Sequence, residues 1–463
     1  MITVVQTIME KVRQQASERP GQEALIFLNA DGVTERLSYR DLLSAVQHRS
    51  SYLRRLPLYS RVGLTSPHGP AFLIDALAII DAGHCLVPIN GAIPAVQRDE
   101  LTERAGIHAL FEHGASDLRI FPGKPIDQAG DDDFRALAPA YLRFTSGSTG
   151  QRKGVLLGHR TILERTETAN KRLQISHTDR VLCLLSMVDH FVISILLYLR
   201  NGATILLVEE EKDAGLLAEQ EKATVIYGAP TQFVVFNRPI PSLRLAVSTT
   251  EPLSESIATQ FLSATGQAIS QALGIIEAGL LTLNDRKART HPLQAGVPMA
   301  DYQLTVTAEK GLAGEIHVAG PGLLDAYVSP WRNRSSLLGP HGFATGDHGW
   351  IDEEGSLHLI GRGKNRIDLN GKTFFSEEIE AVINRHPMVW ESLVLQEGSG
   401  IVAQVVPRND ALTSAHLVHW LNQNLSHSQA TVEIRIVRVL PKTATGKLAR
   451  PRLSQRLILR QGR

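Results

Sequence analysis

Short apolar runs alternate with helix-length segments along most of the chain. The run from Arg61 to Leu64 predicts a strand, residues 71–82 predict a helix, and residues 85–88 predict another strand. The alternation recurs over residues 181–208, whose most apolar part is interrupted at 200–202 by an arginine, an asparagine and a glycine. We interpret that part as a buried helix and a strand, because a membrane span needs about 20 predominantly apolar residues in a row. Such alternation is typical of parallel sheets covered by helices.

The pattern changes after about residue 300, where shorter apolar runs alternate with glycine-rich turns. A smaller α/β unit begins near Gly363, and its first helix is predicted to start at an N-cap, Ser376, followed by two glutamates. Residues 412–425 predict a second helix between two strands. Earlier in the chain, the three aspartates at 131–133 predict a solvated loop. The whole pattern predicts an α/β protein.

Composition and charge exclude several classes of protein. The 43% hydrophobic and 21% charged residues of this 463-residue chain are typical of a globular protein. The 48 basic side chains nearly cancel the 47 acidic ones, so no strong overall field draws the chain to nucleic acid or an anionic membrane. Two cysteines, Cys85 and Cys183, are too few for a disulfide framework. Residues 1–20 lack an apolar core of signal-peptide length, and we expect a cytoplasmic protein without an integral membrane segment.

Residues 144–155 carry the strongest chemical signal in the chain. They read Phe-Thr-Ser-Gly-Ser-Thr-Gly-Gln-Arg-Lys-Gly-Val and follow an apolar run. Glycines let the backbone turn tightly enough to direct N–H groups at phosphate oxygens, hydroxyls add donors, and a lysine adds positive charge. The spacing differs from that of a Walker loop. The candidate phosphate-binding residues are Thr145, Ser146, Gly147, Ser148, Thr149, Gly150 and Lys153.

This stretch resembles the signature of the adenylate-forming superfamily, which includes acyl-CoA synthetases, adenylation domains of peptide synthetases and luciferases. The resemblance continues in the family's order over nearly the whole chain, and we expect an acyl-CoA synthetase-like member. It implies a large N-terminal domain, residues 1–362, of helix-covered sheets plus a distorted barrel-like subdomain. It also implies a small mobile C-terminal α/β domain, residues 363–463, with Lys364 at the hinge. ATP and Mg²⁺ are the implied cofactors.

Residues 271–277 resemble the family's Tyr-Gly-x-Thr-Glu motif, whose glutamate holds Mg²⁺, and this assigns Glu277 to the metal. Gly274 matches the motif, but Leu273 stands where an aromatic residue usually stacks on adenine. Ile276 stands where a threonine usually contacts phosphate. Leucine can still pack on a purine by dispersion, although the contribution of the aromatic quadrupole is lost. We therefore expect weaker ATP binding than is usual in the family.

Three further segments match places where the family holds the nucleoside. Residues 345–347, Thr-Gly-Asp, match the motif whose aspartate accepts both ribose hydroxyls, and this assigns the role to Asp347. Arg362 matches an arginine that reaches the nucleotide in this family. Thr249, Thr250 and Glu251 lie where relatives wrap the adenine with backbone.

The run at 440–450 resembles the family's Pro-x-Thr-x-x-Gly-Lys-x-x-Arg, with Lys447 as the mobile catalytic lysine. An ammonium that contacts both the incoming carboxylate and the α-phosphate orients the attack and neutralises developing charge. Together with Glu277 and the hydroxyl of Thr145, Lys447 forms the predicted catalytic set. In the family, rotation at the hinge presents this lysine for adenylation and another face for thioester formation.

The acid-binding residues are predicted in residues 186–191 and beside the glutamate motif. His190 is the candidate gate residue, and its mostly apolar surroundings favour a hydrophobic or aromatic acid, fatty or aryl. Asp189 leaves an alternative open, because its position also suits the aspartate that binds an amino group in amino-acid-activating domains. The full predicted set is Asp189, His190, Phe191, Leu273 and Ile275.

The leading hypothesis is an ATP- and Mg²⁺-dependent acid–thiol ligase. It would form an acyl-adenylate and transfer the acyl group to the thiol of CoA or of a phosphopantetheinylated acyl carrier protein. One alternative is a standalone adenylation domain that loads an amino acid or aryl acid onto a carrier protein. Another is a degenerate relative that binds nucleotide or acyl-adenylate as a sensor, which the departures at 273 and 276 favour. The intact Lys153, Glu277, Asp347, Arg362 and Lys447 argue against the sensor.

Overall fold

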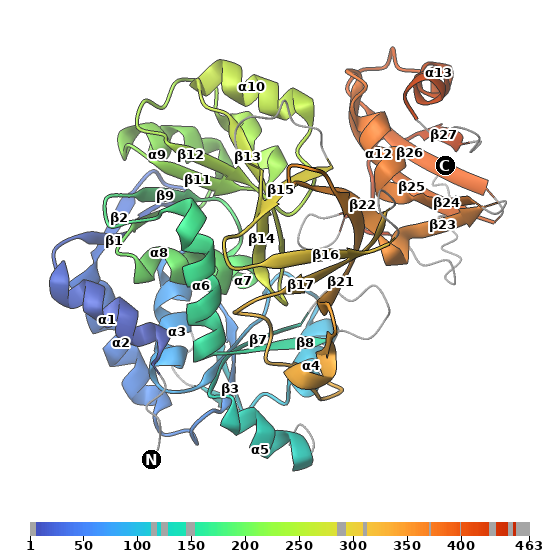
Figure 1. The fold of residues 1–463 in the computed structure, drawn as a ribbon. Helices are drawn as coiled ribbons and strands as arrows, with labels where there is room; N and C mark the ends of the chain where they lie inside the picture. Colours follow the sequence, from blue (N-terminus) through green and yellow to red (C-terminus); the bar gives the residue numbers. More distant parts are fainter. Residues whose placement is uncertain are drawn as a thin grey trace.

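A computed structural model describes residues 6–112, 118–121, 128–144, 153–284, 293–308, 313–369, 372–398, 400–425, 432–442 and 448–450. Figure 1 shows two large sheets with helices between and around them, and a smaller C-terminal lobe beside β22 (Leu357–Arg362). The predicted α/β class, with a large N-terminal part and a small C-terminal part, is confirmed. Across the described residues, no helix has both the length and the apolar character needed to cross a bilayer.

The longer sheet joins a parallel half to an antiparallel half. The strands of the parallel half are almost wholly buried, as expected where helices cover both faces. In spatial order they are β13 (Ile269–Ile275), β12 (Leu245–Ser248), β11 (Val225–Gly228), β9 (Arg180–Cys183), β10 (Thr204–Val208) and β1 (Glu23–Leu28), with β2 (Thr34–Ser38) antiparallel at the edge.

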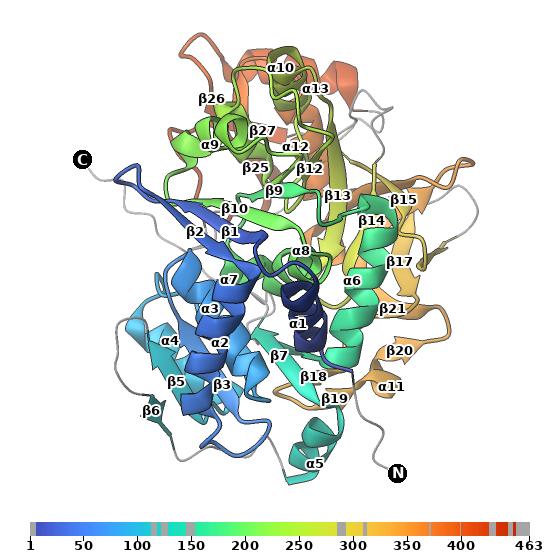
Figure 2. The ribbon, with the colours of Figure 1, turned by 90° about the vertical axis from the view of Figure 1, so that its left-hand side faces the viewer.

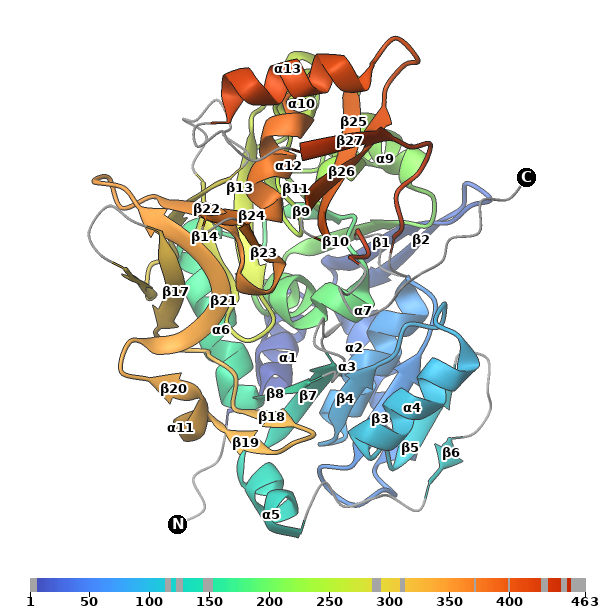
Figure 3. The ribbon, with the colours of Figure 1, turned by 90° about the vertical axis from the view of Figure 1, so that its right-hand side faces the viewer.

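The antiparallel half forms the part predicted as barrel-like, and Figure 3 shows β21 bending strongly across it. From β13 outward its strands are β14 (Gly279–Leu283), β15 (Gln294–Pro298), β22, β21 (Gly342–Ile351), β17 (Gly314–Ala319) and β16 (Gln303–Thr307), with β20 (Leu338–Gly339) beside β21.

The second sheet carries the strands on either side of the signature. Its order is β19 (Arg332–Asn333), β18 (Ala326–Val328), β8 (Gly154–Gly158), β7 (Pro139–Phe144), β4 (Cys85–Pro88), β3 (Arg61–Thr65), β5 (Ala109–Glu112) and β6 (Arg119–Ile120). Strands β7, β4, β3 and β5 are parallel, and the others are antiparallel to their neighbours.

Helices fill the space between the two sheets and share one apolar core with them, as Figure 2 shows for α1, α2, α3 and α8. The helices that contribute are α1 (Ile8–Glu18), α2 (Tyr39–Leu53), α3 (Pro70–Asp81), α6 (His159–Leu173), α7 (Met187–His190) and α8 (Leu196–Arg200). The remaining helices of this part are α4 (Ala95–Ala105), α5 (Gln128–Ala136), α9 (Ala214–Gln220), α10 (Glu255–Thr265) and α11 (Arg334–Leu337). Three short 3₁₀ turns cover Glu211–Asp213, Pro230–Val235 and Gly363–Asn365.

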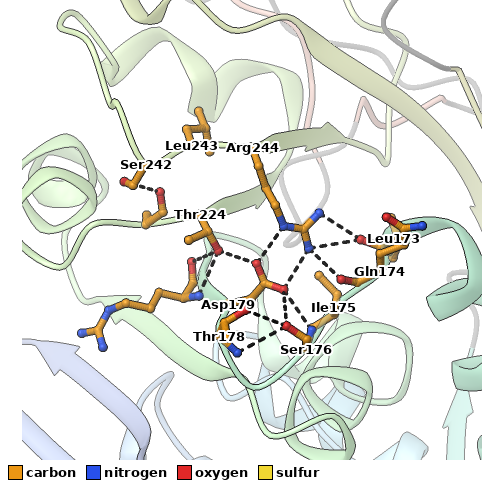
Figure 4. Close-up of polar contacts among 12 residues, drawn as sticks. Leu173, Gln174, Ile175, Ser176, Thr178, Asp179, Thr224, Ser242, Leu243 and Arg244 are labelled. Carbon is orange, nitrogen blue, oxygen red and sulfur yellow. Dashed lines mark hydrogen bonds and ion pairs between the residues drawn. The ribbon is translucent and has the colours of Figure 1, made fainter.

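A polar cluster ties the end of α6 to the parallel sheet (Figure 4). The carboxylate of Asp179 accepts hydrogen bonds from Arg244 at 2.8 and 2.9 Å and from the Thr224 hydroxyl at 2.7 Å. Arg244 also donates to the carbonyl of Leu173, the last residue of α6. Because Thr224 and Arg244 directly precede β11 and β12, the cluster holds α6 in a fixed position against these strands.

The C-terminal lobe has its own apolar core. A three-stranded sheet, β25–β26–β27, packs against α12, and a short hairpin, β23–β24, precedes this helix. The elements are β23 (Arg366–Leu369), β24 (Lys372–Phe375), α12 (Ser376–Asn384), β25 (Val389–Glu397), β26 (Gly400–Pro407), α13 (Ser414–Asn424) and β27 (Val432–Ile436).

Two local predictions are wrong. Residues 131–133 belong to α5, because the neighbouring Phe134 is buried and packs under the guanidinium of Arg61, 5.2 Å from the ring centroid. The helix α12 starts at Ser376 as predicted, but Ser376 is its first residue rather than its N-cap, since its hydroxyl donates to the carbonyl of Asn365 instead of capping the helix. In both places a contact outside the element overrides the local signal.

Candidate active site

The signature and the predicted catalytic lysine fall on parts of the chain that the structure does not describe. Residues outside the described ranges are Thr145, Ser146, Gly147, Ser148, Thr149, Gly150 and Lys447. The flanks of the signature are described: Phe144 at the end of β7 pairs with Gly154 at the start of β8. The signature therefore connects two neighbouring antiparallel strands, and the exposed Lys153 stands where the second strand begins.

Glu277 lies in the turn between β13 and β14, and its carboxylate contacts a residue that the sequence analysis did not single out. The hydroxyl of Tyr327, on β18, donates to Oε1 of Glu277 at 2.9 Å. The ammonium of Lys153 lies 5.0 Å from the centroid of the Tyr327 ring. One tyrosine thus contacts both the predicted metal ligand and the signature lysine. In the sequence, the only indication of this role is that Tyr327 follows closely after the Gly-Pro-Gly segment at 320–322.

The backbone at Glu277 is held by a buried arginine of α6. Arg165 donates to the carbonyls of Ile276 at 3.0 Å and Glu277 at 3.2 Å, and it also donates to the carbonyl of Gly322 at 2.7 Å. Gly322 has φ of +70°, and a Cβ there would lie 2.7 Å from atoms of Arg165. The Glu277 turn and the segment that leads to Tyr327 are therefore anchored to the same side chain.

The predicted ribose-binding pair is assembled on two neighbouring strands. Asp347 on β21 lies opposite Arg362 on β22, and Arg362 Nε lies 2.8 Å from Oδ1 of Asp347. Burial raises the pKa of Asp347 above its ordinary value, an effect that Arg362 opposes. Oδ2 of Asp347 is buried and has no hydrogen-bond partner among the described residues. A ligand hydroxyl would satisfy this acceptor.

The two predicted adenine-site segments follow adjacent parallel strands. Ser248, the last residue of β12, pairs with Gln271 of β13, and the Gln271 side chain accepts from the backbone N–H of Leu253 at 2.8 Å. Thr249, Thr250 and Glu251 lie between these contacts. Thr250 has φ of +79°, a strained conformation for a non-glycine residue. Leu273, Gly274 and Ile276 lie on or beside the next strand, so the structure brings the two segments together.

The predicted acid site contains an ion pair that the sequence analysis did not anticipate. Arg143, the residue before the end of β7, contacts both the carboxylate and the main-chain carbonyl of Asp189. His190 packs edge-on against Tyr227, and Phe191 packs edge-on against Phe72. Ile275 is buried in the core. Arginine directly after the apolar run 140–142 was the sequence signal for this pair.

Phe191 begins a single π-helical turn, Phe191–Ile195, inside the predicted helix. Such turns occur frequently at functional sites. A cavity of about 800 Å³ lies beyond α7, with Met187, Val188 and Phe72 among its lining residues. Neither Asp189 nor His190 lines it.

The described residues fit ATP together with a magnesium ion. The unpartnered oxygen of Asp347 suits a ribose hydroxyl, and Glu277 offers a carboxylate oxygen, the kind of ligand Mg²⁺ prefers. Within the described ranges, no three His, Cys, Asp or Glu side chains are grouped to hold a metal ion by themselves. Lys364 lies in the 3₁₀ turn between β22 and β23.

Comparisons with known proteins agree with this geometry. A family model described as AMP-binding enzyme matches residues 12–328, and a model of the AMP-binding enzyme C-terminal domain matches residues 378–447. A 3-[(3aS,4S,7aS)-7a-methyl-1,5-dioxo-octahydro-1H-inden-4-yl]propanoyl:CoA ligase of Mycobacterium tuberculosis is 26% identical, covering 98% of this chain and 100% of the relative. Phosphinothricin tripeptide synthetase PhsC of Streptomyces viridochromogenes is 27% identical over 90% of this chain and 42% of its own length.

Among solved structures, the O-succinylbenzoate Coenzyme A Synthetase from Bacillus subtilis in complex with AMP superposes with a TM-score of 0.82. The superposition covers 97% of this chain and 98% of that one at 19% identity, which supports the shared fold. The predicted enzyme class, AMP-forming acid–thiol ligases, is confirmed. Because the first family model spans more than half of the sequence, the chain belongs to the AMP-binding enzyme family, the adenylate-forming superfamily that its signature resembles.

Proposed function

We propose that this chain activates a hydrophobic or aromatic carboxylic acid with ATP and transfers the acyl group to the thiol of CoA. The observation that carries the proposal is that side chains able to bind a nucleotide, namely those of Asp347, Glu277 and Lys153, lie near one another. Oδ2 of Asp347 lacks a partner among the described residues, and the charge of Glu277 is close enough to contribute to the raised pKa of Asp347. Lys153 lies over the ring of Tyr327, whose hydroxyl donates to Glu277.

In the first half-reaction, a carboxylate oxygen of the acid attacks the α-phosphorus of ATP. A new P–O bond forms, the bond to the β-phosphate oxygen breaks, and pyrophosphate leaves. In this proposal, signature residues 145–150 and Lys153 bind the phosphates, and Thr145 belongs to the catalytic set. Lys447 contacts the carboxylate and the α-phosphate, where it neutralises developing charge. When bound, Mg²⁺ adds positive charge at the phosphate oxygens, and Glu277 is the residue that would hold it.

In the second half-reaction, the thiol sulfur attacks the acyl carbon, the bond to the adenylate oxygen breaks, and AMP leaves. The thiol proton passes to solvent or a neighbouring base. Asp347 and Arg362 retain the nucleoside through both steps. We assign residues 1–362 and 363–463 to two domains that rotate at Lys364 between the half-reactions.

The acid lacks an amino group in this proposal. The carboxylate of Asp189 is already neutralised by Arg143, and both side chains are less than a quarter exposed. An ammonium of a substrate would have to displace this pair. Of the other four proposed acid-site residues, His190 is polar and Phe191, Leu273 and Ile275 are apolar. A relative matched over its full length is named as a ligase for a bulky alicyclic propanoyl group.

A second candidate is an adenylation domain that loads a carrier protein. The similarity to part of a tripeptide synthetase favours it, since that relative covers 90% of this chain. The two candidates share the first half-reaction and differ in the acceptor and in the class of acid.

Pyrophosphate–ATP exchange tests the proposal directly. Exchange is measured with a panel of fatty, aryl and amino acids, and thioester formation is then measured with CoA and with a phosphopantetheinylated carrier protein. We expect exchange with fatty or aryl acids and transfer to CoA. Exchange with amino acids alone would overturn the assignment of Asp189, and absence of exchange with every acid would support the sensor.

A further inference from the structure

We infer that Tyr327 is a positioning residue that orients the Glu277 carboxylate toward the cation and couples it to Lys153. The inference rests on the proposed function, because it concerns the same nucleotide site. It assigns a role to a residue that lies outside the motifs singled out in the sequence.

The first observation is the double contact of one side chain. The Tyr327 hydroxyl donates to Oε1 of Glu277 at 2.9 Å, and the ring lies 5.0 Å from the ammonium of Lys153. The hydroxyl fixes one carboxylate oxygen and leaves the other available. Partners of this kind commonly orient the residues that bind a metal.

The second observation is that Tyr327 remains a hydrogen-bond donor. The oxygens of an ionised carboxylate only accept hydrogen bonds, so the Tyr327 hydroxyl supplies the hydrogen in the 2.9 Å contact with Glu277. Its contact with Glu277 is a hydrogen bond from a neutral donor to a carboxylate.

The third observation is the rigidity of the place that Tyr327 occupies. It is only 7% exposed, and in the sheet it lies directly opposite Val155, two residues after Lys153. The backbone at Glu277 is held separately by Arg165 and by the N–H of Leu324, which donates to the Glu277 carbonyl at 2.7 Å. Backbone and side chain of Glu277 are thus fixed by different residues.

The structure allows the two contacts to be separated by mutation. Tyr327→Phe removes the hydroxyl and keeps the ring beside Lys153, whereas Tyr327→Leu removes both. Tyr39→Phe is the matched control, because the buried Tyr39 hydroxyl donates to the carbonyl of Ala203 at 2.8 Å, in the core between α2 and β10. All three variants are checked for folding by circular dichroism and thermal melting.

The main readout requires no turnover. Manganese(II) is titrated into each protein saturated with a non-hydrolysable ATP analogue, and free Mn²⁺ is measured by electron paramagnetic resonance. We expect Tyr327→Phe to weaken Mn²⁺ binding about tenfold, the scale for losing a partner that orients a metal ligand. Its KM for ATP in pyrophosphate exchange should change less than about threefold. Tyr39→Phe should bind Mn²⁺ like the original chain.

Tyr327→Leu should weaken Mn²⁺ binding as much as Tyr327→Phe does. It should also raise the KM for ATP, because Lys153 loses its contact with the aromatic ring. The double variant Tyr327→Leu with Lys153→Met should have nearly the same KM for ATP as Tyr327→Leu alone. If Tyr327→Phe binds Mn²⁺ as the original chain does, the inference is overturned while the proposed function stands. If Tyr327→Leu does not fold, the result with Tyr327→Phe decides. If the original chain neither exchanges pyrophosphate nor binds the Mn²⁺–nucleotide complex, the proposed function falls and this inference falls with it.

Discussion

At the scale of single residues, Asp347 shows how burial prepares a carboxylate for a ligand. One oxygen is paired with Arg362, and the other is enclosed without a partner among the described residues. A buried acceptor left unpaired costs free energy, which a donor from a ligand recovers. The same burial also raises the pKa of Asp347, because it disfavours the charged carboxylate.

Asp347→Asn tests this role. The amide keeps the size of the side chain but removes its charge, and a hydrogen bond to a charged group contributes about 1.5–3 kcal/mol. We expect the KM for ATP in pyrophosphate exchange to rise about 10- to 100-fold, since 1.4 kcal/mol corresponds to tenfold. Asp352→Asn is the control, because Asp352 follows the same strand but pairs with His358 at 2.7 Å. Equal KM values for the two variants would contradict the ribose assignment.

At the scale of elements, α6 links the strand that follows the signature to the predicted metal ligand, Glu277. It begins directly after β8, carries Arg165 to the Glu277 turn, and ends at the Asp179–Arg244 cluster (Figure 4). The first residue of α6, His159, is buried, and burial lowers its pKa to about 4. The positive end of a helix also disfavours a charged imidazole there.

This helix start predicts a dependence of stability on pH. The folded pKa of His159 lies below its ordinary value of 6.5, so the stability it contributes is present above pH 6.5 and is lost as the pH falls toward 4. The slope reaches about 1.4 kcal/mol per pH unit for one proton. We expect His159→Gln to flatten the fall in the free energy of unfolding between pH 6.5 and 4, measured by urea denaturation.

His416→Gln, at an exposed position of α13, is the control for this measurement and should keep the original slope. Other groups titrate over the same range, so the comparison concerns the difference between each variant and the original chain. A slope in His159→Gln equal to that of the original chain would show that His159 is not held neutral by the fold.

At the scale of the whole molecule, the C-terminal lobe presents a segment whose ends are firmly held. Lys442 and Leu448 form a β-bridge, and the N–H of Ala449 donates to the carbonyl of Pro441 at 2.8 Å. Arg450 binds both carboxylate oxygens of Glu380 on α12, at 2.8 and 2.6 Å. These contacts attach the segment that contains the proposed catalytic lysine to the lobe, so that it would move with the lobe.

Lys447→Ala tests the two-conformation proposal. Losing one preorganised charge-stabilising group typically lowers the rate about 10²-fold or more, and we expect adenylation to fall by that factor. Thioester formation from supplied acyl-adenylate should stay near its original rate, because the proposal assigns that step to another face of the lobe. Lys442→Ala is the control, since Lys442 pairs with Glu391 at 3.0 Å. A parallel loss of both half-reactions would show that one arrangement serves both.

The sequence alone determined the alternation of strands and helices, the family, and the residues of the nucleotide motifs. These features can be read from residues that are close in the sequence. The spacing of apolar residues indicates which face of a helix or strand is buried, and the residues of a short motif stand at fixed distances from one another. The sequence analysis assigned both Asp347 and Arg362 to the nucleotide, and the structure then showed that the two residues pair with each other. The roles of all the proposed site residues remain predictions, including those of the signature and of Lys447, and so does the domain boundary.

Only the tertiary structure decided which side chains complete the site. Tyr327 reaches Glu277 across 50 residues of chain, Arg165 reaches it across 112, and Arg143 reaches Asp189 across 46. These partners are far apart in the chain, so no local sequence pattern predicts that they meet. The order of the strands and the packing of the helices bring them together. The same long-range packing turned the predicted loop at 131–133 into a helix and neutralised the carboxylate on which the alternative substrate class depended.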